Sequence, residues 1–338
     1  MTKARLAILI VAVLAAAGGA TAYVLNVRQS QADAVARAPK VNTRDDLTAV
    51  TSGEYIAFRT TALGDSYGKV ALVPVAEPTG ARVITPADCD RVYAVRGRAV
   101  CLAADRGIVT TYSARILGTD WAAHQDLPLN GVPSRTRLSR DGTLVATTTF
   151  VFGHDYSAPG KFSTETLVSR VGGGGEASNV EKFDLRVGNQ VITAKDRNMW
   201  GVTFADDDRF YATAAAGKKT WLVEGSLSRR TLRALREDAE CPSLSPDGTR
   251  LAFKRRGDLP PGQWRLAIYD LRTGKETRLA EERSVDDQVE WLDDARIVYG
   301  LPRDTETTPT SDVWVVPADG TGSPQTLIKD AWSPAVVH

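Results

Sequence analysis

Three histidines are the first candidates for chemistry in this sequence of 338 residues. His124, His154 and His338 have no second histidine or cysteine at the short spacing that zinc and iron sites use. Three short acidic runs offer carboxylates for calcium, but none has the alternating acidic pattern and central glycine of a calcium loop. These runs are Asp206–Asp208, Asp286–Asp287 and Asp293–Asp294. Aspartates in such runs usually bond their own backbone in turns, so we expect no metal site and no bound cofactor.

Nucleophilic catalysis has equally few candidates. The sequence contains no Gly-x-Ser-x-Gly motif, which removes the usual nucleophile elbow of α/β-hydrolases. Ser66 and Lys69 match a Ser-x-x-Lys pattern, but neither Ser-Asp-Asn nor Lys-Thr-Gly accompanies them, so we attribute the match to chance. The run Gly172–Gly175 is not followed by Gly-Lys-Ser/Thr and is interpreted as a flexible loop. We assign no catalytic residue and expect a protein that is not an enzyme.

Charge and composition narrow the class of protein. The formal net charge is +1, and beyond Lys3 and Arg5 the remaining 40 basic side chains meet 41 acidic ones. That balance argues against a nucleic-acid-binding surface. The chain is 43% hydrophobic, enough for a large core, and is rich in Val, Thr, Tyr, Trp, Gly and Pro. Short strands joined by tight turns, and therefore an all-β fold, are expected.

The N-terminal segment is the clearest signal of location. Residues Leu6–Leu25 carry no charge over 20 positions, and as a helix they span about 30 Å of hydrocarbon. Lys3 and Arg5 precede them, so the positive-inside tendency leaves the N-terminus in the cytoplasm and exports the rest. A cleaved signal peptide is the alternative, because Ala20–Ala22 offers a small-x-small cleavage site. The sequence predicts a single-pass protein of the cell membrane with its folded part outside the cytoplasm, or a secreted protein.

The sequence divides into three regions. Residues 1–25 are predicted to form the transmembrane anchor or signal segment. Residues 26–46 are polar and Ala-rich, with Pro39 as a helix breaker, and are interpreted as a spacer. Residues 47–338 are predicted to form the folded domain.

An internal repeat defines the fold of that domain. Four segments share an apolar strand, an Asp-centred turn and a second apolar strand: Arg137–Thr147, Val202–Thr213, Ser243–Phe253 and Val289–Tyr299. Their central aspartates, at 141, 207, 247 and 293, are separated by 66, 40 and 46 residues. A period of this size is typical of propeller blades. The long first interval predicts an enlarged loop in the stretch that holds Gly153–Gly160 and Gly172–Gly175.

A second apolar hairpin follows each of these, which gives the four antiparallel strands of a blade. Units are expected at about 54–85, 89–130, 135–185, 199–236, 241–280 and 286–328. The first unit lacks its innermost strand, whereas the tail 331–337 resembles an extra one. Joining the two predicts a six-bladed β-propeller closed by its C-terminal strand and preceded by one hydrophobic helix. This closure protects sheet edges that would otherwise recruit another chain.

The repeat also resembles a known family. Trp332–Pro334 and Ser245–Phe253 are similar to the W-S-P-D-G-x-x-I/L-A-F repeat of TolB-like propellers. Proteins of that family are cell-envelope components that bind other proteins. The resemblance implies an extracytoplasmic interaction module with an envelope protein as partner. A propeller that binds a glycan or peptide is the alternative, followed by a propeller-type lyase or lactonase.

Two further expectations concern single residues. Cys89 and Cys101 fall on the predicted first and second strands of the second unit, so a disulfide is expected there and Cys241 would remain free, although three cysteines allow three pairings. Most of the seven tryptophans recur at equivalent places, which indicates packing between blades. Trp121 lies in a loop-like Gly-Thr-Asp-Trp stretch and is predicted to be a surface contact.

Overall fold

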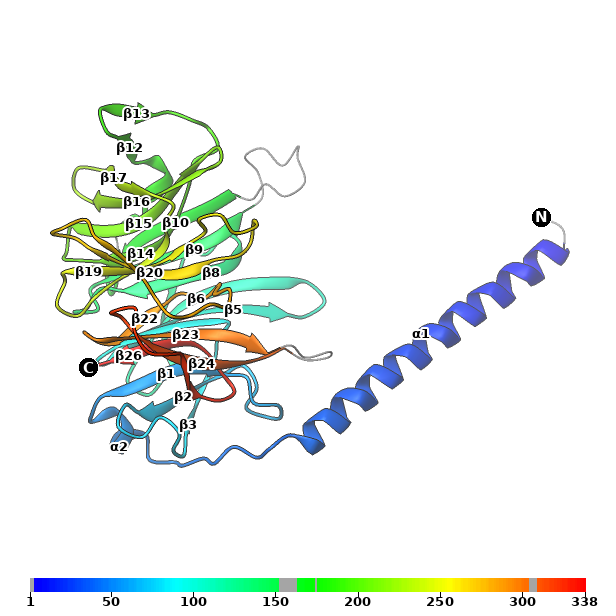
Figure 1. The fold of residues 1–338 in the computed structure, drawn as a ribbon. Helices are drawn as coiled ribbons and strands as arrows, with labels where there is room; N and C mark the ends of the chain where they lie inside the picture. Colours follow the sequence, from blue (N-terminus) through cyan, green and yellow to red (C-terminus); the bar gives the residue numbers. More distant parts are fainter. Residues whose placement is uncertain (1–2, 152–162, 174, 304–308) are drawn as a thin grey trace.

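The computed structural model describes residues 3–151, 163–173, 175–303 and 309–338 (Figure 1). It contains six sheets, each built on four antiparallel strands, which we call blades 1 to 6 in chain order. Strands A to D of a blade run from the channel outward. The six A strands contact one another in ring order, β26, β4, β8, β14, β18 and β22, so they enclose a central channel. The predicted all-β six-bladed propeller is confirmed.

The blades take their strands in chain order, apart from the first. Blade 1 is β26 (Ala331–Val337), β1 (Tyr55–Thr60), β2 (Lys69–Pro74) and β3 (Val83–Asp88). Blade 2 is β4 (Arg91–Val95), β5 (Arg98–Arg106), β6 (Thr110–Leu117) and β7 (Ala123–Leu127). Blade 3 is β8 (Val132–Leu138), β9 (Leu144–Val151), β10 (Ser163–Arg170) and β11 (Ser178–Asn179), followed by the 3-10 turn η1 (Val180–Lys182).

The remaining blades hold the best-preserved repeats. Blade 4 is β14 (Asn198–Phe204), β15 (Arg209–Ala216), β16 (Lys219–Ser226) and β17 (Thr231–Glu237). Blade 5 is β18 (Glu240–Leu244), β19 (Arg250–Arg255), β20 (Arg265–Asp270) and β21 (Glu276–Arg278). Blade 6 is β22 (Glu290–Asp293), β23 (Arg296–Arg303), β24 (Thr310–Pro317) and β25 (Gln325–Ile328).

One hairpin was not foreseen from the repeat. Strands β12 (Asp184–Val187) and β13 (Gln190–Ile192) extend blade 4, with β12 parallel to β17. The buried side chain of Leu185 packs into the core of blade 4, which explains why this segment joins that blade. Part of the long first interval between repeats is therefore this hairpin. The stretch predicted to hold an enlarged loop includes Gly153–Gly160, which lies outside the described residues. Of its second glycine run, Gly172, Gly173 and Gly175 are described.

The Asp-centred turns owe their shape to local hydrogen bonds. In blade 5, Asp247 accepts bonds from the hydroxyl of Ser245 and from the amide and hydroxyl of Thr249. Gly248 has φ +70°, a left-handed conformation that favours glycine. Slight burial opposes ionisation, but these bonds and nearby Arg250 lower the pKa of Asp247 to about 2. The turn that carries the repeat signature is thus fixed by side chains within six residues of each other.

Two helices precede the ring. Helix α1 (Lys3–Arg37) runs well past residue 25, and it contains one segment long and apolar enough to cross a membrane. Pro39, which cannot continue a helix, follows its end. Residue Thr43 then bridges Arg82 at the outer edge of blade 1, and α2 (Leu47–Thr51) leads into β1. The predicted spacer is therefore helical up to Arg37 and attached to the propeller near its other end.

Ring closure joins the two ends of the domain. Strand β26 pairs antiparallel with β1, from Tyr55 opposite Val337 to Thr60 opposite Ala331. Val337 and Ala335 belong to the core shared by blades 1 and 2. Trp332 is only partly buried, with Arg91 stacked over its ring, so the backbone pairing and the small buried side chains make this strand's main contribution.

Deleting residues from Asp330 onward is therefore expected to destabilise the domain severely. The loss removes the A strand of blade 1 and exposes an edge of β1, against a typical net stability of about 5–15 kcal/mol. Thermal melts of the two truncated chains check this, with removal of His338 alone as the control. That control loses only exposed contacts with Glu54 and Arg96 and should melt near the parent. A chain ending at Lys329 that melts within about 2 °C of the parent would refute closure by this strand.

The cysteine pair offers a second test. Cys101 lies in β5, whereas Cys89 lies in the link between β3 and β4, two residues before the strand on which it was expected. The structure joins them in a disulfide with Cα atoms 5.4 Å apart, and Cys241 is a buried free thiol. We predict that peptide mapping without reductant recovers the 89–101 linkage and leaves Cys241 alkylatable only after unfolding. Closing so short a loop contributes about 3 kcal/mol on chain-entropy grounds, so C89S/C101S should lower the urea midpoint.

Candidate functional site

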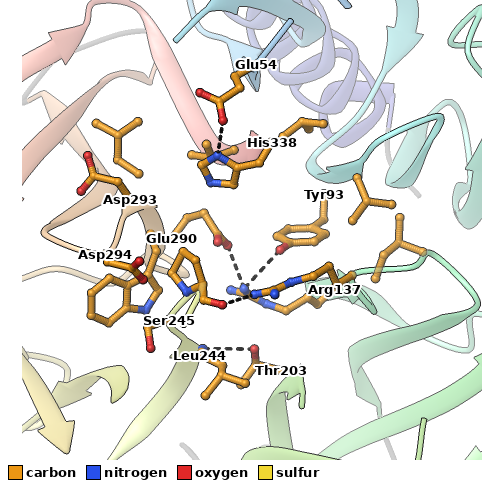
Figure 2. A pocket seen from close by; sticks show the side chains of 18 of the residues that line it. Glu54, Tyr93, Arg137, Thr203, Leu244, Ser245, Glu290, Asp293, Asp294 and His338 are labelled. Carbon is orange, nitrogen blue, oxygen red and sulfur yellow. Dashed lines mark hydrogen bonds and ion pairs between the residues drawn. The ribbon is translucent and has the colours of Figure 1, made fainter. Parts of the chain in front are cut away.

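The A strands end together around a cup that we call the channel mouth. It has a volume of about 570 Å³ and is formed by the ends of all six A strands and the turns that follow them (Figure 2). The repeat explains this convergence, because each Asp-centred turn connects strand A to strand B at the same end of its blade. The residues that line it include Glu54, Val95, Arg96, Leu138, Arg140, Phe204, Leu244, Pro246, Trp291, Leu292, Asp293 and His338.

Arg137 occupies the floor of the channel mouth. Its side chain is 3% exposed and donates to Glu290 at 2.8 Å, Ser243 Oγ at 3.1 Å and the carbonyl of Val289 at 3.2 Å. Its guanidinium also lies over the ring of Tyr93. Arg137 itself belongs to blade 3, and its partners belong to blades 2, 5 and 6 and to the link before blade 6. One side chain therefore connects four of the six blades.

Burial governs the electrostatics of that floor. It raises the pKa of Glu290, and Arg137 opposes this shift by stabilising the carboxylate. Burial likewise raises the pKa of Tyr93, so its hydroxyl stays protonated at neutral pH. The floor therefore presents a fixed ion pair and a phenol rather than a free acid or base.

The wall and rim of the channel mouth differ in character. Apolar side chains form the wall, among them Val95, Leu138, Phe204, Leu244 and Leu292. The rim is charged, but its charges are largely occupied: Arg296 pairs with Asp293, and Arg140 donates to the carbonyl of Pro246. His338 contacts Glu54. An apolar cup with a polar rim is suited to a side chain or short segment of another molecule.

Beyond Arg137 the channel continues as a network of ion pairs. Arg91 pairs with buried Asp287 at 2.8 Å, and Asp286 accepts from both Lys254 at 2.6 Å and Arg135 at 3.3 Å. The Nε of Arg135 is buried without a hydrogen-bond partner. These residues make the interior of the channel strongly charged.

Of the candidate residues named from sequence, His338, Asp293 and Asp294 line the channel mouth, whereas Trp121 and His124 lie elsewhere. Trp121 is 3% exposed and packs into the core of blades 1 and 2, so the predicted surface contact is wrong. Its positive φ of 60° turns the ring inward, whereas the surrounding Gly-Thr-Asp sequence had indicated a loop. His124 bonds Asp120 in the same turn, and His154 lies outside the described residues. Among the described residues, no group of three or more His, Cys, Asp or Glu side chains is arranged to hold a metal ion.

Sequence analysis missed Arg137 and Glu290. The available signal was a charged residue inside an apolar repeat strand: the other repeats have Val or Ser at the position of Arg137, and Leu or Thr at the position of Glu290. A buried arginine needs an acidic partner, and Glu290 begins the strand of another repeat. Their spatial pairing across the ring could not be read from spacing along the chain.

Comparison with solved structures shows which known proteins share this fold. A scan against protein-family models and a search of curated proteins found no match. TolB from Acinetobacter baumannii aligns with a TM-score of 0.58 at 14% identity, over 86% of this chain and 68% of that chain. A putative TolB from Agrobacterium tumefaciens aligns with a TM-score of 0.50 at 12% identity, over 83% of this chain and 90% of that one. The fold is a TolB-like six-bladed propeller.

Enzymes also carry the TolB-like propeller architecture. A puromycin-hydrolyzing peptidase from Mycobacterium tuberculosis aligns with a TM-score of 0.50 at 16% identity, over 82% of this chain but only 45% of the peptidase. The structural alignments show a common fold, whereas identities of 12–16% do not show a common activity.

Replacing Arg137 with methionine is expected to destabilise the TolB-like propeller by about 3–5 kcal/mol, because Glu290 is then buried without its ion-pair partner. The loss should shrink at low pH. Burial raises the pKa of Glu290 in the parent, and without Arg137 the folded variant protonates Glu290 more readily. The loss of stability relative to the parent therefore grows as the pH rises above the ordinary pKa of glutamate. Urea unfolding at pH 5 and pH 8 measures both effects.

Two companion variants make that experiment specific. R137M/E290Q removes both charges and should recover much of the lost stability and most of the added pH dependence. R115M removes an exposed ion pair with Asp126 and should change the stability by less than about 1 kcal/mol. If R137M unfolds at the same urea concentration as R115M, the ion pair is not a main support of the ring.

Proposed function

We propose that this chain is a membrane-anchored TolB-like propeller that binds a segment of another cell-envelope protein in its channel mouth. Residues 1–25 remain as the anchor, residues 26–46 link it to the propeller, and residues 47–338 form the binding domain outside the cytoplasm. The observation that carries the proposal is the cup of about 570 Å³, with its apolar wall and a charged rim whose groups are already paired.

The character of the cup favours a peptide segment over a reaction centre. Catalysis by general acid and base needs titratable groups that face the substrate with shifted pKa values. In the floor, Glu290 is held by Arg137, and the wall offers apolar side chains. A protein segment with one or two apolar side chains matches that wall, and polar backbone groups match the rim.

The anchor supports the same conclusion. Helix α1 has the length and composition of a membrane span, and Lys3 and Arg5 precede its apolar run. By the positive-inside tendency these charges stay in the cytoplasm, which puts the propeller outside. An envelope partner would then share its compartment.

Photo-crosslinking in intact cells tests the proposed partner site. A photoreactive phenylalanine analogue in place of Phe204, in the wall of the channel mouth, should give one discrete crosslinked protein. The same analogue in place of Arg272, in the exposed turn between β20 and β21, is the matched control and should not. Adding L244D to the Phe204 variant should abolish the product. A product that forms equally from both positions, or that survives L244D, would contradict binding in the channel mouth.

A further inference from the structure

Exposed apolar side chains on the propeller are concentrated in one place. Outside α1, the large hydrophobic side chains with high exposure in the described residues are Ile108, Val109, Val132, Phe150 and Val191. Ile108 and Val109 are the extreme cases, at 108% and 75% exposure. They form the turn between β5 and β6 in blade 2. Leaving two neighbouring aliphatic side chains in water at a hairpin tip is unfavourable unless something covers them.

The alternation of strands fixes the face on which this tip lies. Turns from strand A to strand B surround the channel mouth, so turns from B to C lie on the opposite face. The β5–β6 tip is such a turn. Val132 begins β8 and Phe150 lies near the end of β9, which puts both at the same end of the neighbouring blade. Of the five exposed side chains, only Val191, in the β12–β13 hairpin, lies outside this group.

Helix α1 reaches the propeller at that same face. The Cγ1 atom of Val35, near the end of α1, lies 4.0 Å from where a Cβ on Gly64 would be. Gly64 belongs to the turn between β1 and β2, the B to C turn of blade 1. Figure 1 shows α1 and the β5–β6 hairpin on the same side of the ring, away from the C-terminus.

Both the end of α1 and the β5–β6 hairpin project from this face (Figure 1). From Leu25, the end of the apolar run, to Val35 the helix rises about 15 Å. Strand β5 has nine residues and β1 has six, so the β5–β6 hairpin extends about 10 Å further than the edge of blade 1. The side chains behind the tip, Arg106 and Tyr112, combine an apolar body with a polar end, as residues at a membrane interface do.

We propose that Ile108 and Val109 insert into the lipid–water interface of the membrane that holds α1. This inference rests on the proposed function in one respect, that α1 is retained as an anchor. The anchor keeps the tip close to the bilayer, so even a small apolar contact forms at high effective concentration. Two attachment points, α1 and the tip, hold the propeller at a fixed orientation with its channel mouth facing away from the membrane.

Depth-dependent quenching in the full chain tests the contact. The variant V109C, in a C241S background so that the remaining cysteines are paired, carries an environment-sensitive fluorophore and is reconstituted in phosphatidylcholine nanodiscs. R272C, labelled in the same way, is the control on the opposite face. We expect a blue-shifted emission for V109C and at least threefold stronger quenching by interfacial spin-labelled lipid. Adding I108E should reduce the quenching to the R272C level.

The outcomes separate this inference from the function on which it rests. Alkaline carbonate extraction of the same nanodisc chain and of native membranes is done first, and release of the chain would show that α1 is not an anchor. An anchored chain whose V109C probe is quenched no more than R272C overturns the lipid contact alone. A probe that is exposed in pure lipid but shielded in native membranes also overturns it, because a protein then covers the tip.

Discussion

Closure of the ring by β26 is the constraint on which the other features depend. A propeller of separate blades would leave an unpaired strand edge at its first blade, and β1 would present that edge to other chains. Pairing with β26 removes it and brings residues 55 and 337 into register. Closure also completes the circle of A strands, and only a complete circle gathers six strand ends around one cup. The strand topology therefore determines where the channel mouth lies, and the side chains determine its chemical character.

The channel interior explains how such a ring tolerates degraded repeats. An apolar channel would need well-matched side chains from all six blades to fill it. Here charged side chains reach across the axis, and Arg137 contacts residues from blades 2, 5 and 6. Long side chains with several donors can satisfy partners at varied distances, so the blades need not be identical. The cost is that the buried charges of the channel, such as Arg137 and Asp287, depend on partners from other repeats.

Sequence analysis predicted the elements well because their signals are local. The Ser-Pro-Asp-Gly turn is stabilised within six residues, and the missing first strand and surplus last strand were both visible as repeat units. What it failed to predict depends on contacts between distant residues. Trp121 turns inward through one positive φ, the β12–β13 hairpin joins a blade by burying Leu185, and Arg137 meets Glu290 across the ring. The spacing of residues along the chain does not predict these contacts, because the partners lie in different repeats.

The two faces of the propeller have different roles if both proposals hold. In blades 3 to 6 the turns from A to B are short and held by aspartates, which gives this part of the channel mouth a rigid outline suited to a specific protein segment. Turns from B to C vary in length, and the one in blade 2 carries exposed aliphatic side chains on the face where α1 ends. A membrane on that face leaves the rigid face open to partners that approach from the far side. The anchor and the tip then lie on one face and the channel mouth on the other, so the helix that tethers the propeller also sets the direction in which it binds.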